Sequence, residues 1–211
     1  MVVIRFTITW FLLCFVSACS VGGLIGDKKQ TVPPVDVSTF PPMRVVAYDI
    51  TVPTSLSVSE DNAYKPIADI VWRGDPYGSR YPQVKAIFDA GVKKGISTVS
   101  GTVPVRLEIV VRRFHSQSER VRYSYGGKYE IEYDLTISAS GVGQVLVPTY
   151  TVYIEADAPG GIAALAAEQS GRTEKVDNIN LIAQSIYTQL TGKFPAVASA
   201  ALTKDSPSVA Q

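Results

Sequence analysis

Two stretches in the middle of the chain alternate between apolar and polar side chains. Residues 105–112 and 129–137 place an apolar residue at every second position, and most of the residues between them are charged. A third apolar run, 145–157, follows the turn-forming sequence SGVGQ. Successive side chains of a strand point to opposite faces, so this pattern predicts consecutive antiparallel strands with one apolar face and one solvated face.

Two other segments repeat their apolar residues with the period of a helix. In 81–96, the positions i, i+3, i+4 and i+7 are Val84, Ile87, Phe88 and Gly91. In 174–190, one stripe contains Ile179, Ile182, Ala183, Ile186 and Leu190. Each stripe covers one side of a helix, so both segments are predicted to be helices that bury a single face.

Shorter signals complete the pattern. Residues 43–53 indicate a first strand that ends at Pro53, and residues 67–75 indicate a short second strand. The Gly/Ala-rich segment 158–172 is long for a connection within a compact domain, with room for a short helical turn at 162–168. The order of elements predicts an α+β fold: an antiparallel β-sheet of about four to five strands with two helices packed on one face.

The N-terminal apolar run indicates export. Residues 6–18 are almost wholly apolar and follow a single charge, Arg5. About 13 residues are too few to span a bilayer as a helix, but they match the apolar core of a secretory signal. The sequence VSAC, which ends at Cys19, resembles the lipobox of bacterial lipoproteins. The resemblance implies cleavage before Cys19 and attachment of acyl chains to it; the alternatives are cleavage elsewhere or an uncleaved anchor.

These signals divide the chain into four parts. We expect a lipoprotein signal peptide at 1–18, the lipidated Cys19 with a flexible tether at 19–43, an α+β domain at 44–193 and a disordered C-terminal tail at 194–211. Ser20 stands where an inner-membrane retention signal usually carries Asp, and by resemblance to enterobacterial sorting this favours the outer membrane. The expected location is the inner leaflet of the outer membrane, facing the periplasm.

Cleavage would also change the chemistry of the chain. Cys14 leaves with the signal and lipid consumes Cys19, so the mature protein keeps no free thiol and forms no disulfide. Arg5 is lost from 20 basic and 19 acidic residues, which leaves 19 of each. A neutral balance argues against binding of nucleic acid, which usually requires a basic excess or face.

The order of elements resembles the transport-auxiliary (PqiC-like) family of envelope lipoproteins and, more distantly, the lipopolysaccharide-assembly lipoprotein LptE. The likeness rests on a lipobox, a short tether, the segment DIVWRGDPYGSRYPQV before the first helix, a long β-hairpin and a final helix. It implies a structural partner of a lipid-transport system. An uncharacterised lipoprotein family is the other resemblance that fits, and the segment 158–172 has no counterpart that we can assign.

Residues for catalysis are scarce. His115 is the only histidine, and its place at the end of a strand is typical of a surface imidazole. Glu130, Glu132 and Asp134 share one face of a strand, but it is the solvated face. The chain contains no His/Cys cluster for zinc, and GVGQVL lacks the third glycine of a dinucleotide loop. We therefore expect no enzymatic activity, no metal and no cofactor besides the lipid on Cys19.

Two segments are candidates for binding a partner. The first, 112–129, mixes arginines with aromatic residues, and its candidate residues are Arg112, Arg113, Arg120, Arg122 and Tyr125. The second, 71–82, offers Arg73, Tyr77 and Arg80, while Trp72 is expected to pack under the first helix. Tyr and Arg are enriched at interface hot spots, and outside the cytoplasm a lipid phosphate or an acidic protein surface would suit the arginines. The alternative for 112–129 is a solvated hairpin with arginines paired to Glu119, Glu130 and Glu132.

These observations predict an outer-membrane-anchored periplasmic lipoprotein that serves as a non-enzymatic accessory or docking module of an envelope lipid-transport system. Its partners would be transporter subunits or an outer-membrane protein. The alternative is a stand-alone binder of a lipid or small apolar ligand. An enzymatic function is not expected, because this chain lacks residues suited to catalysis.

The lipobox can be tested directly. Cys19→Ser should abolish incorporation of labelled fatty acid and shift the protein out of the membrane fraction, because several acyl chains at about 0.8 kcal/mol per buried methylene supply the anchor. Cys14→Ser is the matched control and should leave both properties unchanged. Continued labelling of the Cys19→Ser variant would show that the lipobox interpretation is wrong.

Overall fold

The computed structural model describes residues 29–30 and 35–193. The predicted signal peptide, the predicted lipidation site Cys19 and the predicted C-terminal tail therefore lie outside the described residues. These residues form seven strands: β1 (Lys29–Gln30), β2 (Met43–Thr51), β3 (Val58–Ser59), β4 (Ile70–Val71), β5 (Val103–His115), β6 (Gly127–Ala139) and β7 (Val145–Ala158). The helices are η1 (Val37–Thr39), α1 (Arg80–Ile96), α2 (Glu119–Arg122), α3 (Gly161–Gln169) and α4 (Glu174–Thr191).

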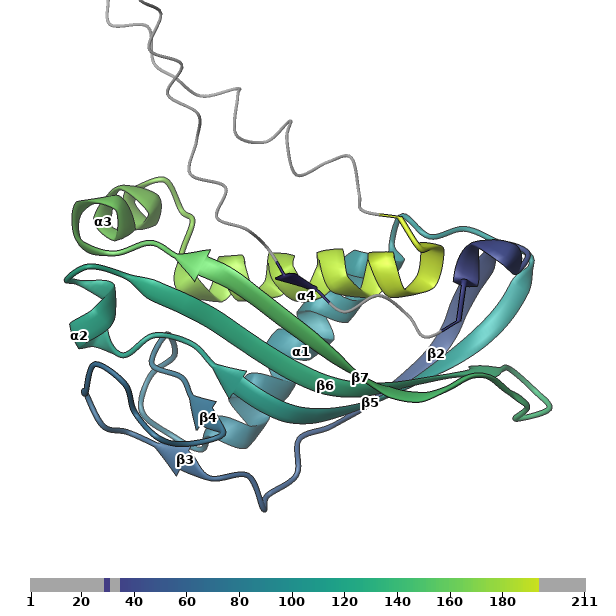
Figure 1. Ribbon diagram of the computed structural model, residues 1–211, viewed down its shortest axis with the longest axis horizontal. Coiled ribbons are helices and arrows are strands. Elements are labelled where there is room, and N and C mark those ends of the chain that lie inside the picture. Colours follow the sequence, from purple (N-terminus) through teal and green to yellow (C-terminus); the bar gives the residue numbers. More distant parts are fainter. Residues whose placement is uncertain (1–28, 31–34, 194–211) are drawn as a thin grey trace, which may run out of the picture.

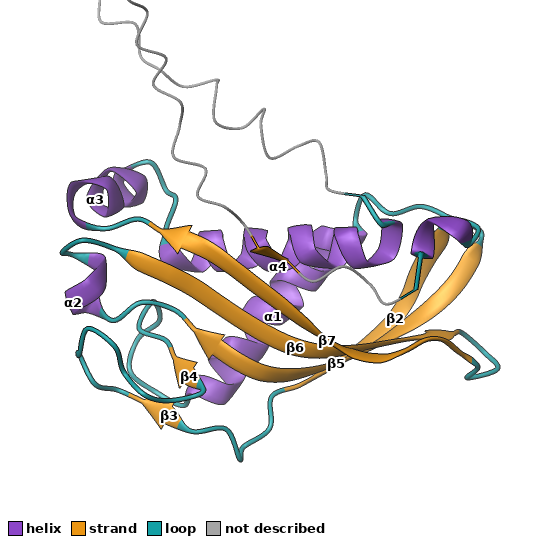
Figure 2. Cartoon of the chain, in the orientation of Figure 1, coloured by secondary structure: helices purple, strands orange, loops and turns teal. Residues whose placement is uncertain are grey.

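The strands form one sheet in the order β1-β7-β6-β5-β4-β3, with β2 beside β5 (Figures 1 and 2). β5, β6 and β7 form an antiparallel meander, in which Leu107 pairs with Ile137 and Ile131 pairs with Ile154. The long helices α1 and α4 lie on one face of this sheet. The predicted α+β class, the three consecutive antiparallel strands and the two helices on one face are thus confirmed.

Strand direction differs from the prediction in the N-terminal part of the sheet. β2 runs parallel to β5, and the two-residue strands β3 and β4 also pair in parallel, so the sheet is mixed rather than antiparallel. Parallel neighbours require a crossover connection, and α1 supplies it between β2 and β5. Alternation of apolar residues carries no information on strand direction, which is why the sequence pattern left this feature out.

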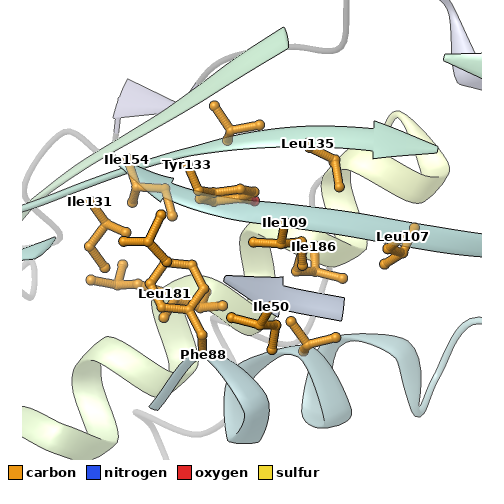
Figure 3. Close-up of a cluster of buried hydrophobic side chains, with 14 of the residues drawn as sticks. Ile50, Phe88, Leu107, Ile109, Ile131, Tyr133, Leu135, Ile154, Leu181 and Ile186 are labelled. Atoms are coloured by element: carbon orange, nitrogen blue, oxygen red, sulfur yellow. The ribbon is translucent and has the colours of Figure 1, made fainter. Parts of the chain in front are cut away.

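Large side chains fill the space between the sheet and the helices (Figure 3). Phe88 of α1 meets the ring of Tyr133 edge-on, with centroids 5.7 Å apart. The buried hydroxyl of Tyr133 forms a hydrogen bond with Ser185 of α4 at 2.7 Å, so the polar end of this core tyrosine has a partner. The predicted inner face of β5 and β6 is therefore a filled core.

The two long helices approach each other closely at glycines. A Cβ atom at Gly95 would lie 2.6 Å from the carbonyl oxygen of Ala183, and one at Gly91 would lie 2.6 Å from Cγ2 of Ile182. Real Cβ contacts are essentially never this short. The absence of a side chain at these two positions, one turn apart on α1, allows the backbones of α1 and α4 to pack directly together.

Two features at the ends of the domain extend the sequence prediction. Val37 in η1 and Met43 at the start of β2 are buried, so the folded part of the chain includes residues just before residue 44. The helical turn expected within 158–172 is present as α3, which exposes Ile162 and Leu165. Among the residues described, none of the helices combines the length and apolar character that crossing a membrane would require.

The glycine contact predicts a reversal of the usual helix preference. Ala exceeds Gly by about 1 kcal/mol inside a helix, yet Gly95→Ala should lower the free energy of unfolding by about 1–2 kcal/mol because the added methyl group collides with the backbone of α4. Ala86→Gly, at an exposed position of the same helix, is the control and should cost about 1 kcal/mol through helix propensity alone. Urea unfolding measures both, and a more stable Gly95→Ala variant would contradict the proposed contact.

Candidate functional site

The two predicted binding segments come together at one end of the sheet, where β3, β4, α2 and α3 lie (left in Figure 1). Arg73, from the loop after β4, contacts Glu119 of α2 at 3.8 Å. Its guanidinium also donates to the carboxylate of Glu60 at 2.9 Å and to the Glu60 carbonyl at 2.8 Å. Arg73 therefore joins the two segments, but its hydrogen bonds are made within the protein.

Arg80 is buried rather than available to a partner. Its Nε and Nη2 atoms donate to the two carboxylate oxygens of Glu60 at 2.6 and 2.8 Å, in a bidentate pair, and Nη1 donates to Gln83 at 2.8 Å. The hydrogen bond from Arg80 holds the pKa of Glu60 below its usual value. The arginine predicted to bind a partner thus fixes the loop around residue 60 to the start of α1.

Trp72 packs in the core, as the sequence predicts. Its side chain is fully buried and meets Phe114 edge-on at 5.7 Å. The indole Nε1 donates to Asp75 Oδ2 at 3.0 Å, and Lys175 of α4 donates to Asp75 Oδ1 at 2.7 Å. Asp75 thus connects the loop after β4 to the N-terminal turn of α4.

Exposed aromatic groups form a surface next to α2. The rings of Tyr64 and Tyr125 stack with centroids 5.4 Å apart, and the guanidinium carbon of Arg120 lies 5.2 Å from the centroid of Tyr64. We call these three residues the tyrosine–arginine ledge. Tyr125 is 72% exposed and Tyr64 is 53% exposed. Tyr125 and Arg120 were predicted, whereas Tyr64 stands alone in a polar loop and gave no sequence signal.

The remaining predicted residues lie apart from the ledge. Arg112 pairs with Asp134 at 3.2 Å and Arg113 pairs with Glu130 at 3.0 Å. Both pairs join β5 to β6, as in the solvated-hairpin alternative, although Asp134 was not among the partners expected there. Tyr77 is 90% exposed in its loop, as expected.

A buried polar cluster lies between α2, α3 and the start of α4. Arg122, 4% exposed, donates from Nε to Glu168 of α3 at 2.7 Å. Glu174, at the first position of α4, accepts from the backbone N–H of Gln117 at 2.8 Å and from the hydroxyl of Ser116. Burial raises the pKa of the Glu174 carboxyl. Periodicity showed Glu174 only as the polar start of a helix, so the sequence did not identify this cluster.

Two pockets flank the helices at opposite ends of α4. The first, of about 220 Å³, is lined by polar residues from the loop after β4, α2, α3 and the N-terminal turn of α4. The second, of about 280 Å³, is lined by residues of η1, the loop after α1 and the C-terminal turn of α4. Only the first pocket adjoins the residues predicted to bind a partner.

Other groups considered for chemistry have structural roles. His115 is half-buried, with Nε2 3.0 Å from the carbonyl oxygen of Pro66, and burial lowers its pKa so that the neutral ring is favoured. Asp134 accepts from Arg112 and from Thr151 on the solvated face. Within residues 29–30 and 35–193, no three His, Cys, Asp or Glu side chains lie in an arrangement that would hold a metal ion.

The sequence matches the model of a family of unknown function, DUF6778, over residues 43–204, and the chain belongs to this family. Comparison with curated proteins gives no significant match. The family assignment therefore brings no activity with it.

Solved structures give distant likenesses. A PelC dodecamer from Paraburkholderia phytofirmans shares 10% identity at a TM-score of 0.34, over 78% of this chain and 96% of that one. A Xanthomonas campestris protein of the DUF330 family shares 15% identity at a TM-score of 0.38, over 77% and 91% of the two chains. A candidate lipoprotein from Caulobacter crescentus shares 16% identity at a TM-score of 0.27, over 73% and 93%. Because these TM-scores are low, the likenesses assign no function to this chain.

The Glu60–Arg80 pair leads to a pH-dependent prediction. The pKa of Glu60 is lowered in the folded state, so its contribution to stability is present at neutral pH and is lost as the pH falls below about 4.5 towards the folded-state pKa. Glu60→Gln should cost about 2 kcal/mol at pH 7, because it leaves the buried Arg80 without its charged partner while Glu60 itself is partly exposed.

The difference between wild type and Glu60→Gln should shrink at acidic pH, which denaturant unfolding from pH 7 to pH 3 measures. Glu108→Gln, on the solvated face of β5, is the matched control and should stay within about 0.5 kcal/mol of wild type. A pH-independent difference would show that the charge of Glu60 is not what stabilises the fold.

Proposed function

We propose that this protein is a lipid-anchored, non-enzymatic envelope protein that docks onto a component of a lipid-transport system through the tyrosine–arginine ledge. The observation that carries the docking role is the ledge itself. Tyr64 and Tyr125 stack in solvent with Arg120 beside them. Aromatic rings and arginine are the side chains that dominate interface hot spots.

The proposed location rests on the N-terminal sequence. The apolar run 6–18 followed by VSAC suits a cleaved lipoprotein signal with Cys19 as the anchor. The strand β1 then restricts the reach of the tether, because its backbone is paired with β7, in the register that places Lys29 opposite Glu155. The ten residues from Cys19 to Lys29 span at most about 35 Å, so the β7 edge of the domain would stay within that distance of the membrane surface.

The non-enzymatic part of the proposal rests on the bonding of the polar groups. Arg73 and Arg80 share Glu60, and Arg112 and Arg113 pair with carboxylates of the neighbouring strand. Side chains engaged in this way hold loops and strands together. Arg120 differs, because its guanidinium lies against an exposed ring. The ledge, which combines the predicted Arg120 and Tyr125 with Tyr64, is thus the surface best suited to contact another protein.

The stand-alone lipid binder has less support. Such a protein would need space between the sheet and the helices, where Phe88, Tyr133 and Trp72 are fully buried and in contact with other aromatic rings. The two pockets lie at the ends of α4, and the first is lined by charged and polar side chains. The first pocket therefore does not suit an acyl chain, and the second, although Phe40, Met43 and Leu190 are among its lining residues, lies outside the space between the sheet and the helices.

Site-specific photo-crosslinking in cells tests the docking role. A photoreactive phenylalanine analogue at position 125 should give one dominant crosslinked product that contains a lipid-transport component. The same analogue at Val142, in the exposed turn between β6 and β7, should not give that product. Arg120→Ala should reduce the yield from position 125 severalfold, because truncation of one hot-spot residue typically costs more than 1 kcal/mol of binding free energy.

Two results would contradict the proposal. Equal crosslinking of the same protein from positions 125 and 142 would show that proximity rather than docking produces the adduct. Crosslinking only to a soluble periplasmic protein without a role in lipid transport would replace the proposed partner. The Cys19→Ser variant tests the anchor separately, since it changes none of the residues of the ledge.

A further inference from the structure

The first pocket contains a cationic side chain with unused hydrogen-bonding capacity. Arg122 lines this pocket and is 4% exposed. Its Nη2 atom is buried and has no hydrogen-bond partner in the structure. A guanidinium has five N–H donors, and leaving such donors unpaired away from water is costly.

The contact with Gln117 does not resolve this deficit. Nη1 of Arg122 lies 3.5 Å from the side-chain oxygen of Gln117, which is a long hydrogen bond. The amide of Gln117 is better satisfied in the reversed orientation, in which its oxygen accepts from the N–H of Gly127 at 3.1 Å and its nitrogen donates to Pro159 at 3.3 Å. In that orientation Arg122 keeps the carboxylate of Glu168 as its closest acceptor, the hydroxyl of Tyr129 also interacts with the guanidinium, and Nη2 stays without a partner.

The N-terminal turn of α4 faces the same pocket. Thr173, Glu174 and Lys175 all contribute to its lining. Thr173 caps the helix by accepting from the N–H of Val176 at 3.3 Å. The N–H groups at the first positions of a helix have no acceptor within it, and the positive end of the helix dipole attracts anions. The N-terminal turn of the 18-residue helix α4 and the side chain of Arg122, with its unpaired Nη2, therefore line the same pocket.

The other charges of the pocket limit the ligand to one negative charge. Arg73, Arg122 and Lys175 line it together with Glu119, Glu168 and Glu174. The lining thus has three cationic and three acidic side chains, and burial raises the pKa of the Glu174 carboxyl. A doubly charged phosphate would meet Glu119 and Glu168, whereas a carboxylate or a phosphodiester carries a single charge and two oxygens for the Arg122 fork.

We propose that this pocket binds a singly charged oxyanion, a carboxylate or a phosphodiester, through Arg122 and the N-terminal turn of α4. Lys175, whose Nζ is held by Asp75 at 2.7 Å, adds positive charge at the edge. A volume of about 220 Å³ holds the oxyanion and a small group attached to it. The ledge is a separate surface, so this binding site goes beyond the proposed docking function.

Titration of the purified full chain at constant ionic strength tests the site. The probes are acetate for a carboxylate and dimethyl phosphate for a phosphodiester, followed by calorimetry and by NMR of arginine side-chain resonances. At least one probe should bind saturably with a single site and shift the Nε resonance of Arg122. Acetate alone would identify a carboxylate ligand, and dimethyl phosphate alone would point to a diester such as a lipid headgroup.

Three variants locate the binding. Arg122→Lys keeps the charge but loses the planar fork, and should weaken binding about tenfold. Lys175→Met should weaken binding about threefold. This variant tests the site independently if Arg122→Lys lowers the stability of the fold. Arg112→Met removes an exposed arginine on the solvated sheet face and should leave affinity unchanged. The proposal is overturned if neither probe binds saturably, or if Arg122→Lys and Lys175→Met both bind as tightly as wild type.

Discussion

The close approach of α1 and α4 at Gly91 and Gly95 determines where the rest of the molecule can lie. With no side chain between the backbones, α4 settles against α1 and over β6 and β7. Tyr133 of β6 bonds to Ser185, and Tyr150 of β7 bonds to Gln189 at 2.7 Å. These contacts fix the position of α4 along the sheet. Its N-terminal turn is thereby brought to the end where the loop after β4, α2 and α3 meet.

The interior changes character along α4. Towards the middle of the helix it is apolar and filled by large side chains (Figure 3). At the N-terminal turn it is polar, and the buried residues there include Ser116, Gln117, Arg122, Glu174 and Asn178. Buried polar groups cost free energy unless all of them are paired, and both Arg122 and Asn178 retain an unpaired atom. An apolar core would stabilise the domain better, so this arrangement is more readily explained by binding than by folding.

Sequence patterns predicted the elements that obey a simple period. Alternation in 105–112 and 129–137 identified the inner face of β5 and β6, and the helical stripes identified α1 and α4. The pattern did not predict the direction of the strands, because a parallel and an antiparallel strand bury the same alternating residues. The pattern also did not predict the contact between α1 and α4. Gly91 fits the apolar stripe of its own helix, but its closeness to Ile182 depends on a residue distant in sequence.

The candidate site was predicted by composition and corrected by geometry. Clusters of arginine and tyrosine drew attention to the end of the domain where the loop after β4 meets α2, yet Arg73, Arg80 and Arg122 turn inward to Glu60 and Glu168. Composition cannot distinguish an arginine that is free to contact another protein from one whose hydrogen bonds hold two segments of the same chain together. Tyr64 is the opposite case. Its sequence context gave no signal, and it joins the ledge only because the fold stacks the ring of Tyr125 on it.

The loop that carries Tyr64 is held in place before any partner arrives. Ser118, the N-cap of α2, donates to the carbonyl of Ala63 at 2.6 Å, and the N–H of Arg120 donates to Asn62 at 2.7 Å. These bonds tie the two residues that precede Tyr64 to the start of α2. The docking proposed for the ledge would then avoid most of the entropy cost of ordering a loop and two tyrosines, at about 0.5–1.5 kcal/mol for each immobilised side chain. A small ledge of three residues can consequently contribute more to binding than its area alone would suggest.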